Sequence, residues 1–265
     1  MLGAAAAAVL AAAAFWIVPS SLVLREYDVT SNLAVLKGRR IAVISDLHAG
    51  APYIDAGKLD QVVAMTNAAR PDIILLTGDY AGEDNWFSSG MPYPEIARHL
   101  AALDAPMGVF AVLGNHEDFD KAAAQAALEQ AGILVLRNFQ IVISTARGPL
   151  LLAGIGDQAR GDDDVRRALG RIPAGMQALC FTHSPDLFPG LPETCSLTIA
   201  GHTHGGQVAL PLVGRPIVPS RFGQLYAQGL VREGSKTLFV STGIGTTHLP
   251  VRLGVTPEIS LLKIQ

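Results

Sequence analysis

Two histidines lie two residues apart in the segment AGHTHGGQ, which runs from Ala200 to Gln207. The whole chain of 265 residues contains only seven histidines. Side chains at positions i and i+2, at the end of a strand or in a tight turn, can reach the same side of the backbone. Because neutral imidazole is a common ligand of divalent transition metals, His202 and His204 are either a coincidence or two ligands aimed at one site.

Four other apolar runs end in the same kinds of side chain. The runs RIAVIS, DIILLTG, GVFAVLG and ALCFT are followed by Asp46-Leu47-His48, Asp79, Asn115-His116-Glu117 and His183, respectively. In open α/β sheets the carboxyl ends of the strands line the ligand-binding crevice. Each motif alone has an ordinary structural explanation, such as a turn aspartate or a hydrogen-bonded core histidine. Five such groups at the ends of five predicted strands are better explained by one shared site.

The eight candidate side chains favour a site for two divalent metal ions. Imidazole nitrogens, carboxylates and one amide oxygen suit Mn, Fe, Zn, Co or Ni, among which the sequence does not distinguish. No cysteine takes part, which argues against a structural zinc site. One ion would be over-supplied with ligands, whereas two ions sharing a bridging carboxylate would use most of them. Two ions about 3.5–4 Å apart can clamp a phosphoryl group and activate a bridging hydroxide, so phosphoester hydrolysis is the predicted chemistry.

Short apolar runs that alternate with helical patterns predict the elements that position these side chains. Leucine-rich and β-branched runs are typical of strands buried on both faces. The predicted strands are RIAVIS, DIILLTG, GVFAVLG, LVLRN, QIVIST, LLLAGIG, ALCFTH, LTIAG, TLFVST and ISLLKI, and REYDVTSNLAVLKGRR is expected to open the domain with an edge strand. The predicted helices are Ala56–Ala69, Pro94–Leu103, Lys121–Ala131 and Asp163–Leu169. Helices alternate with strands early and strands dominate late, which indicates an α/β protein with more than one sheet.

The composition excludes several classes of protein. With 49% hydrophobic and 16% charged residues, the chain is not disordered. A net charge of -3 and the absence of any Lys/Arg run give no sign of a nucleic-acid-binding surface. The two cysteines form no disulfide framework. Cys180 lies in the apolar run ALCF and is expected to be a free thiol in the core, with a Cys180–Cys195 bridge as the less favoured alternative.

Residues 1–24 are predicted to be a membrane anchor, followed by one folded domain over residues 25–265. The stretch 2–18 has no charge, and nine of its seventeen residues are alanine. Seventeen helical residues span about 25 Å, and extension through Leu24 would complete the thickness of a bilayer core. Trp16 near the end of the stretch favours the anchor. A signal peptide, which would normally carry Lys or Arg before its apolar region, and a buried helix of the domain are the alternatives.

The order of the motifs resembles a known family. DLH, GD, GNHE, a strand-end histidine and GHTH form the motif series of the calcineurin-like metallophosphoesterases, and this chain matches it from Asp46 to His204. The resemblance continues through GIGD at Gly154–Asp157 and into STGIGTTHLPVRLGVTPEISLL. Within the superfamily, the chain is most similar to the membrane-associated bacterial YaeI/YkuE-like phosphodiesterase branch. The fold that this implies is a four-layer α-β-β-α sandwich, with two mixed sheets flanked by helices, after an N-terminal apolar helix.

The resemblance also assigns roles to the candidate residues. It implies that Asp46, His48 and His204 hold one ion, that Asn115, His183 and His202 hold the other, and that Asp79 bridges the two. His116 would lie outside the metal ligands and face the substrate, either protonating the leaving oxygen or neutralising charge on the phosphoryl group. Glu117 receives no catalytic role. The glycines at 201, 205 and 206 are expected to let the backbone pass close to the metals.

The function implied by the resemblance is a two-metal phosphodiesterase or pyrophosphatase at a bacterial membrane, with a metal-bridging hydroxide as the nucleophile. UDP-2,3-diacylglucosamine, or a related nucleotide- or lipid-linked diester, is the suggested substrate. The alternatives are a phosphomonoesterase or protein phosphatase on the same fold, and a non-catalytic membrane-anchored metal-binding protein. Trp86, Phe87 and Tyr93, within Gly82–Leu100, form either an apolar substrate wall or an ordinary surface loop.

Charge around the apolar stretch predicts which side of the membrane the domain occupies. Basic residues follow the stretch within about 20 residues and none precedes it; they are Arg25, Lys37, Arg39 and Arg40. The positive-inside rule then favours a catalytic domain that faces the cytoplasm. Free thiols at both cysteines would be normal in that compartment.

Overall fold

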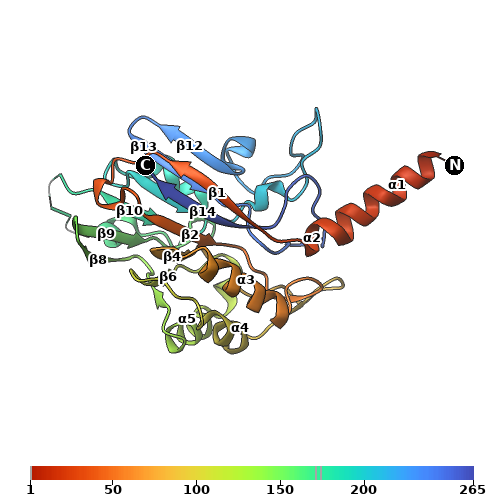
Figure 1. Ribbon diagram of the computed structural model, residues 1–265, viewed down its shortest axis with the longest axis horizontal. Coiled ribbons are helices and arrows are strands. Elements are labelled where there is room, and N and C mark those ends of the chain that lie inside the picture. The colour runs from red at the N-terminus through yellow and green to blue at the C-terminus, as the bar shows by residue number, and fades with distance from the viewer. Residues whose placement is uncertain (1, 171, 174) are drawn as a thin grey trace.

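Two six-stranded mixed sheets make up the body of the protein, shown by a computed structural model that describes residues 2–170, 172–173 and 175–265 (Figure 1). The first sheet has the order β1 (Val23–Val29), β14 (Glu258–Ile264), β2 (Arg40–Ile44), β4 (Ile73–Leu76), β6 (Val109–Ala111) and β7 (Leu134–Val135). The second has the order β12 (Gly229–Glu233), β13 (Lys236–Val240), β11 (Leu197–Ala200), β10 (Ala178–Phe181), β9 (Gly148–Gly154) and β8 (Phe139–Thr145). A short ribbon pairs β3 (Gly50–Ala51) with β5 (Ser89–Gly90).

The two sheets pack face to face over a common core. Alternate residues of the central strands point into it, for example Ile41 and Val43 from β2, and Leu179 and Phe181 from β10. This follows from the period of two along a strand, since every second side chain faces the same layer. The other alternate residues face the outer layers, so these strands are buried on both sides, as their continuous apolar sequences predict.

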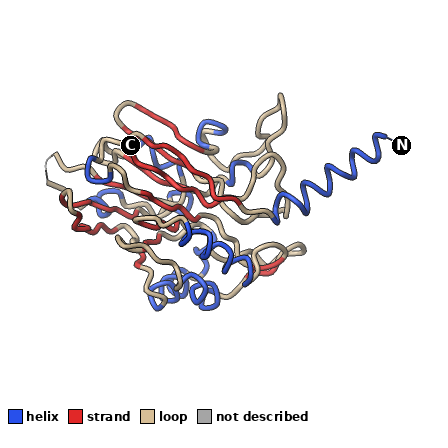
Figure 2. The backbone as a smooth tube through the Cα atoms, viewed as in Figure 1, coloured by secondary structure: helices blue, strands red, loops and turns tan. Residues whose placement is uncertain are grey.

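Helices cover the outer faces of the two sheets unequally. The helices α3 (Ala56–Ala68), α4 (Tyr93–Leu100) and α5 (Lys121–Gln130) pack on the first sheet (Figure 2). On the second sheet the cover is thinner, consisting of α6 (Val165–Leu169) and the 3-10 segments η5 (Pro185–Gly190) and η7 (Gly223–Tyr226). The architecture is therefore the expected α/β sandwich of two mixed sheets between helices, with a reduced fourth layer.

Most of the predicted elements are confirmed within a few residues of their expected bounds. The segment after the apolar stretch forms β1 at the edge of the first sheet, as expected. The QIVIST run differs from the prediction, because it lies in the edge strand β8 and exposes alternate residues instead of being buried on both faces. The strands β3, β5 and β12 were not predicted, since short or polar edge strands lack a continuous apolar run.

The N-terminal segment forms a helix that projects away from the sandwich (Figures 1 and 2). It consists of α1 (Leu2–Ala12), the π-helical η1 (Ala13–Ile17) and α2 (Val18–Ser20). The stretch 3–20 is long and apolar enough to cross a membrane, and 11% of it is buried. The alternative of a buried core helix is therefore wrong. The expected division after residue 24 falls inside β1, which pairs with β14 along its whole length.

The structure contradicts the expectation of free thiols. Cys180 in β10 and Cys195, just before β11, form a disulfide with their Cα atoms 5.5 Å apart. The two strands are parallel neighbours, and this pairing brings together residues that are 15 positions apart in the sequence. Spacing alone did not reveal the bond, because it depends on which strands are adjacent. Both residues are fully buried, as expected for Cys180.

Replacing both cysteines with alanine should lower the stability of the domain by about 2–4 kcal/mol, because the bond closes a loop of moderate length in the unfolded chain. For a chain of this size the melting temperature should fall by roughly 4–16 °C. Circular dichroism melts of Cys180→Ala, Cys195→Ala and the double variant would measure this. All three should melt alike, and reductant should lower only the wild-type value. A double variant that melts like the wild type would contradict the bridge.

Candidate metal centre

All seven predicted metal ligands lie at the carboxyl ends of five neighbouring strands. Within each sheet these strands run parallel to one another, so their carboxyl ends meet at one edge of the sandwich. The ligands follow β2 (Asp46 and His48), β4 (Asp79), β6 (Asn115), β10 (His183) and β11 (His202 and His204). The structure thus brings together residues that are up to 158 positions apart, since 204 minus 46 is 158.

The first group contains Asp46, His48, Asp79 and His204, each of which offers one ligand atom within 4.8 Å of the others. The Nε2 atoms of His48 and His204 are 3.1 Å apart. Asp79 Oδ2 lies 3.5 Å from Nε2 of His48, and Asp46 Oδ1 lies 3.6 Å from Nε2 of His204. All four residues are buried.

The second group shares Asp79 with the first and adds His183 and His202. Asp79 Oδ2 lies 3.2 Å from Nε2 of His183, and Nδ1 of His202 lies 3.0 Å from that same nitrogen. The amide oxygen of Asn115 is also 3.0 Å from it. One carboxylate therefore belongs to both groups, which is the arrangement expected of a bridging ligand.

The surroundings of these side chains fit a divalent metal centre. His183 Nδ1 lies 2.8 Å from the carbonyl oxygen of Thr77, so this nitrogen donates and Nε2 is directed at Asp79 and the other ligands. Asp46 accepts a hydrogen bond from the Ser45 hydroxyl and a bifurcated one from the His202 backbone N–H, which lies 3.0 and 3.1 Å from its two carboxylate oxygens. Lone pairs from several buried nitrogens and oxygens converge at short range, an arrangement that a cation stabilises.

Burial keeps three of the four histidines of the centre in the neutral form that binds metals. Desolvation lowers the pKa of His48 to about 3 and that of His202 to about 4, and it lowers the pKa of His204 well below its usual value. Burial raises the pKa of Asp79, but the charge and hydrogen bond of His183 outweigh it and hold the pKa well below its ordinary range. Burial also lowers the pKa of His183, but the charge and hydrogen bond of Asp79 outweigh it and raise that pKa well above its usual value. The site thus presents three neutral imidazoles beside a His183–Asp79 pair.

Five of the seven ligands adopt a backbone conformation that L-residues rarely use. The φ angles of Asp46, His48, Asp79, His202 and His204 lie between 43° and 71°. Non-glycine residues in this left-handed region are strained and concentrate at functional sites. Here the positive φ values occur immediately after the strands. We infer that they turn the side chains from the strand direction toward the shared centre.

The glycines around GHTH have different roles from one another. A Cβ at Gly201 would come within 2.7 Å of Asp46 Oδ2, so the expected close approach is confirmed there. A Cβ at Gly205 or Gly206 would instead meet Val255 or the carbonyl of Ile217, neither of which is a ligand. The expectation for these two positions is wrong, because the chain after His204 turns away from the metal groups and packs on other loops.

His116 lies beside the metal groups without belonging to either. Its Nε2 is 3.8 Å from Asp79 Oδ2, and its backbone N–H donates to Asp79 Oδ1 at 3.0 Å. Its Nδ1 lies 3.3 Å from Glu83 Oε1. With Tyr93, the ring lines a cavity of about 370 Å³. This position agrees with a residue that faces substrate, and its catalytic role remains a prediction.

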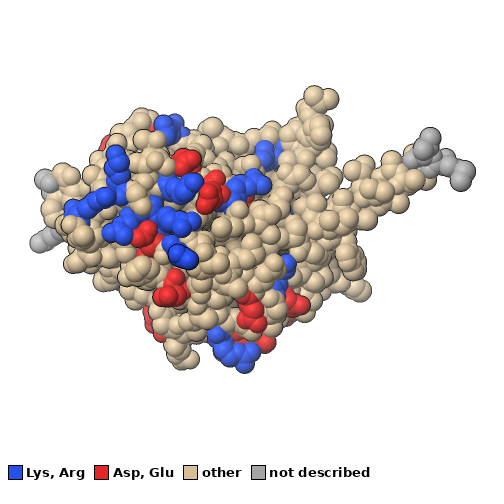
Figure 3. Space-filling model, viewed as in Figure 1, with Lys and Arg blue, Asp and Glu red and all other residues tan. Residues whose placement is uncertain are grey.

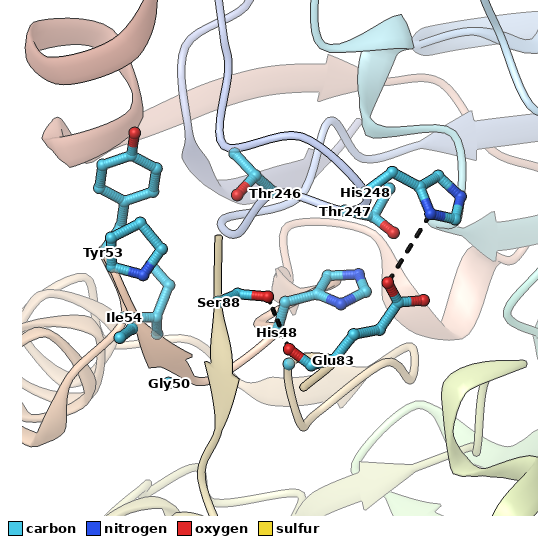
Figure 4. Close-up of a pocket in the computed structure, with 12 residues that line it drawn as sticks. His48, Gly50, Tyr53, Ile54, Glu83, Ser88, Thr246, Thr247 and His248 are labelled. Carbon is cyan, nitrogen blue, oxygen red and sulfur yellow. Dashed lines mark hydrogen bonds and ion pairs between the residues drawn. The ribbon is translucent and has the colours of Figure 1, made fainter. Parts of the chain in front are cut away.

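A small cleft of about 20 Å³ adjoins the first metal group at His48 (Figure 4). His48 lines it between the loop that carries Tyr53 and the segment 246–248, and Glu83 lies at the opposite side. Nδ1 of His248 is 3.7 Å from Glu83 Oε2. Glu83 therefore stands between the cavity at His116 and the cleft at His48.

Glu117 is a functional residue that the sequence analysis left without a role. Its carboxylate is fully buried and accepts backbone N–H bonds from Asp79 at 2.9 Å, Tyr80 at 2.8 Å and Gly114 at 2.8 Å. These three bonds join the turn that carries Asp79 to the turn that leads to Asn115. Glu117 is therefore a positioning residue, and its place in GNHE was the available signal.

Replacing Glu117 with glutamine should weaken metal binding by roughly 10–100-fold, the usual effect of losing a group that orients ligands. The amide cannot accept all three backbone bonds, so the two turns should lose their fixed spacing. Calorimetric titration of metal-free protein with Mn²⁺ would measure the affinity. Glu129→Gln on the exposed side of α5 is the matched control and should bind like the wild type. Unchanged affinity in Glu117→Gln would contradict the positioning role.

Arg252 is a second residue missed by the sequence analysis. Its guanidinium is fully buried and donates to the carbonyls of Thr242 at 2.9 Å and Gly245 at 2.6 Å. Burial lowers its pKa to about 10, so it remains a cation at neutral pH. It fixes the loop that closes over the first metal group, and its charge opposes protonation of His48 and His204. Its motif, HLPVRLG, lies within the stretch that carried the family resemblance.

Asp157 ends the GIGD motif and is also buried. Neither of its carboxylate oxygens has a side-chain or backbone hydrogen-bond partner among the described residues. Burial raises its pKa, while the nearby charge of His183 lowers it. This carboxylate therefore lies close to the second metal group with its hydrogen-bonding capacity unused.

The sequence comparisons agree with this geometry. Residues 39–206 match the model of the family described as calcineurin-like phosphoesterase. The matched region covers most of the chain and contains all seven candidate ligands and His116. The protein belongs to the calcineurin-like phosphoesterase family, and it is a metal-dependent phosphoester hydrolase.

Several relatives extend the similarity beyond the matched region. The chain is 30% identical to the "uncharacterized metallophosphoesterase YkuE" of Bacillus subtilis, covering 100% of this chain and 95% of that protein. It is 30% identical to "phosphodiesterase YaeI" of Escherichia coli, covering 85% and 82%. A "transmembrane protein with metallophosphoesterase domain" from Danio rerio is 27% identical over 87% of this chain and 54% of that protein. The expected similarity to the YaeI/YkuE-like branch is thus confirmed.

Proposed function

We propose that the protein is a two-metal phosphodiesterase that acts at a membrane. The observation that carries this proposal is Asp79, whose carboxylate is shared by two groups of buried ligands. Two ions bridged in this way would be held by Asp46, His48 and His204 on one side, and by Asn115, His183 and His202 on the other. When bound, such ions supply Lewis acidity and ionise water at neutral pH.

The protein's own residues would orient the substrate and move protons. His116 lines the cavity beside the centre, where its imidazole would face the leaving oxygen of a bound ester. Glu83 Oε1, 3.3 Å from Nδ1 of His116, holds the ring in place and leaves its Nε2 directed toward Asp79, as a general acid at the centre would require. Thr77, Ser45 and Glu117 hold the ligands in place through the hydrogen bonds described above. Burial of the centre excludes bulk water, which strengthens these charge interactions.

The charge of the approach supports a diester over a monoester. The cleft at His48 and the cavity at His116 have no Lys or Arg among their described lining residues, and Glu83 lines both. A phosphomonoester is largely dianionic at neutral pH, whereas a diester carries one negative charge. An acidic approach through these two openings disfavours the dianion more, whereas a third cavity, at the ligand His202, is lined by both Asp186 and Arg221. The relative from E. coli that is called a phosphodiesterase supports the same choice.

Hydrolysis of two chromogenic esters by the full-length protein would test this function. Protein stripped with a chelator should be inactive, and addition of Mn²⁺, Zn²⁺ or another divalent metal should restore activity. The kcat/KM for bis-p-nitrophenyl phosphate should exceed that for p-nitrophenyl phosphate. A preference for the monoester would favour a phosphomonoesterase or protein phosphatase. Metal binding without hydrolysis of either ester would favour a non-catalytic metal-binding protein.

We infer that residues 1–24 anchor the protein in a membrane and that residues 25–265 form the catalytic domain. The exposed apolar helix at 3–20 supports an anchor over a core helix, and the transmembrane relatives support membrane association. A cleaved signal sequence would pass the same test of length and composition. Mass spectrometry of the protein recovered from membranes would distinguish them, because only an uncleaved anchor retains residues 1–24.

We propose further that the catalytic domain lies on the non-cytoplasmic side, opposite to the orientation expected from charge. The Cys180–Cys195 disulfide supports an oxidising compartment. The basic residues after the anchor are weaker evidence for a cytoplasmic domain, because they belong to the folded domain. Ion pairs join Arg25 to Glu258, Arg39 to Asp72 and Arg40 to Glu26. Large domains are translocated largely regardless of such charges.

Reporter fusions at the carboxyl terminus would test the orientation. An alkaline phosphatase fusion should be active and a green fluorescent protein fusion dark when the protein is exported through the general secretory route. Bright fluorescence together with an inactive phosphatase would show that the domain faces the cytoplasm. In the exported orientation a lipid-linked diester is the favoured substrate. UDP-2,3-diacylglucosamine, the nucleotide-linked candidate, belongs in the substrate panel as the comparison.

A further inference from the structure

Three loops near the metal centre expose large apolar side chains to solvent. Trp86 and Phe87 lie in the loop before β5, Leu212, Val213 and Ile217 lie in the segment after GHTHGGQ, and Leu249 lies before Arg252. Trp86 is 100% exposed and Ile217 is 77% exposed. We call these six residues the apolar rim. Single exposed apolar residues are common, but a cluster on one face indicates an interaction surface.

The three loops of the apolar rim adjoin one another. Phe87 and Leu249 line one small cavity together. Ile217 and Leu249 line a second, larger cavity of about 440 Å³, whose other lining residues include Val208 and Val251. His204 lies at the inner side of this larger cavity, next to the first metal group. The segment 246–251 thus joins the rim loops to each other and to the centre.

The N-terminal helix leaves the domain at this same end. The hydroxyl of Tyr53 donates to the carbonyls of Phe15 at 2.5 Å and Pro250 at 2.8 Å. The backbone N–H of Arg252 donates to the carbonyl of Ala14 at 2.9 Å. The base of the helix is therefore bonded to the segment that carries Leu249. Figure 1 shows the loops before β5 and before η7 projecting toward the end from which α1 emerges.

The charge distribution agrees with contact to an apolar medium at this end. In Figure 3 most of the Lys and Arg side chains on the visible face gather away from α1, and α1 has no charged residue. The loop of Trp86 carries one exposed charge, the carboxylate of Asp84, which accepts a hydrogen bond from the Gly90 N–H at 2.8 Å. Arg215 lies between Val213 and Ile217, but its Nε donates inward to the carbonyl of Gly205 at 2.9 Å. Arg215 is half-buried, and this bond ties its guanidinium to the domain side of the tip around Leu212.

We propose that the apolar rim inserts into the surface of the lipid bilayer that α1 enters. This inference rests on the membrane anchor of the proposed function. It adds a second attachment, which fixes the orientation of the domain and sets the metal centre against the lipid headgroups. Trp86 would lie in the interfacial layer that tryptophan favours. A phosphodiester in the membrane surface would then reach His48 and His204 without leaving the bilayer.

The two tryptophans of the chain provide a direct test, because each can be made the only one. Full-length Trp16→Phe, reconstituted in phosphatidylcholine vesicles, retains Trp86 as its sole tryptophan, which can be excited selectively at the red edge of the absorption band. We expect its emission to shift to shorter wavelength relative to the protein in detergent. Brominated phosphatidylcholine should quench it at least twofold. Trp86→Phe retains Trp16 and tests the anchor by the same quenching.

The matched negative control is a tryptophan placed at the other end of the strands. Ala146 is exposed in the turn between β8 and β9, so Trp16→Phe/Trp86→Phe/Ala146→Trp should not be quenched. Equal quenching at positions 86 and 146 would overturn the proposal, as would an unquenched Trp86 beside a quenched Trp16. A blue shift of Trp86 in detergent that grows with protein concentration would overturn it in favour of contact with a second copy of the chain.

Hydrolysis of a soluble ester and of a vesicle-bound ester provides a second test of the apolar rim, because only the second reaction requires contact with the membrane. Leu212→Ser/Val213→Ser should hydrolyse bis-p-nitrophenyl phosphate like the wild type, since neither residue touches the metal groups. Its kcat/KM for phosphatidyl-p-nitrophenol in phosphatidylcholine vesicles should fall about tenfold. Equal rates of both proteins on vesicles would contradict the rim. If the wild type hydrolyses neither ester while Trp86 is quenched, the proposed catalytic function fails and the membrane contact stands.

Discussion

Asp79→Asn is expected to abolish hydrolysis, with kcat/KM for bis-p-nitrophenyl phosphate falling by several orders of magnitude. Asp79 supplies the only carboxylate common to the two ligand groups, with Oδ2 3.5 Å from His48 and 3.2 Å from His183. The amide is nearly the same size but carries no charge to offset two cations. Loss of this one bridging carboxylate should therefore weaken the binding of both ions.

Metal content and folding should respond differently to this substitution. Inductively coupled plasma mass spectrometry should find up to two ions per chain in the wild type and less than one in Asp79→Asn. The circular dichroism spectrum should be retained, because the sandwich core does not depend on Asp79. Asp60→Asn, on the exposed side of α3, is the matched control and should keep both metals and activity. Normal turnover by Asp79→Asn would refute the two-metal assignment.

His116→Ala is expected to keep its metals and lose activity. The Nε2 of His116 is 3.8 Å from Asp79 Oδ2, and His116 belongs to neither ligand group. A positioned proton donor is worth roughly 10²–10⁴ in kcat. The loss should be larger for esters of poorly acidic alcohols, which need a proton on the leaving oxygen, than for p-nitrophenyl esters.

A series of diesters with leaving groups of different acidity would measure this dependence. His99→Ala, which removes an imidazole that pairs with Asp60 outside the site, should behave like the wild type throughout the series. Equal losses for all leaving groups would assign His116 to charge stabilisation instead of proton transfer. Loss of metal in His116→Ala would show that His116 is itself a metal ligand and that the two ligand groups are incorrectly assigned.

Much of this site could be predicted from the sequence because its residues follow buried strands. A continuous apolar run is a strong signal for a central strand, and a polar residue directly after it is placed at the sheet edge by the strand itself. Asp46, Asp79 and His183 were found in this way. The same reasoning located the first sheet's helices, since α3 and α5 have clear apolar faces and end signals.

The residues that support the ligands, Glu117 and Arg252, could not be predicted in this way, because their partners are backbone atoms, some of which lie far away in the sequence. Glu117 binds three N–H groups from two turns, and Arg252 binds carbonyls of a loop. Neither interaction leaves a pattern of side chains in the sequence. The edge strand β12 was missed for a related reason, since a half-exposed strand has no continuous apolar run.

The sequence by itself determined the kind of chemistry, an α/β fold with more than one sheet and the apolar nature of the N-terminal helix. Side-chain type and the periods of strands and helices are local properties, so they can be recognised in the sequence without knowing which elements are in contact. Only the tertiary structure decided that Asp79 lies in two ligand groups and that Cys180 meets Cys195. It also decided that the exposed loops gather where α1 leaves the domain. Each of these depends on strand order and loop placement, which bring residues within a few ångströms across many intervening positions.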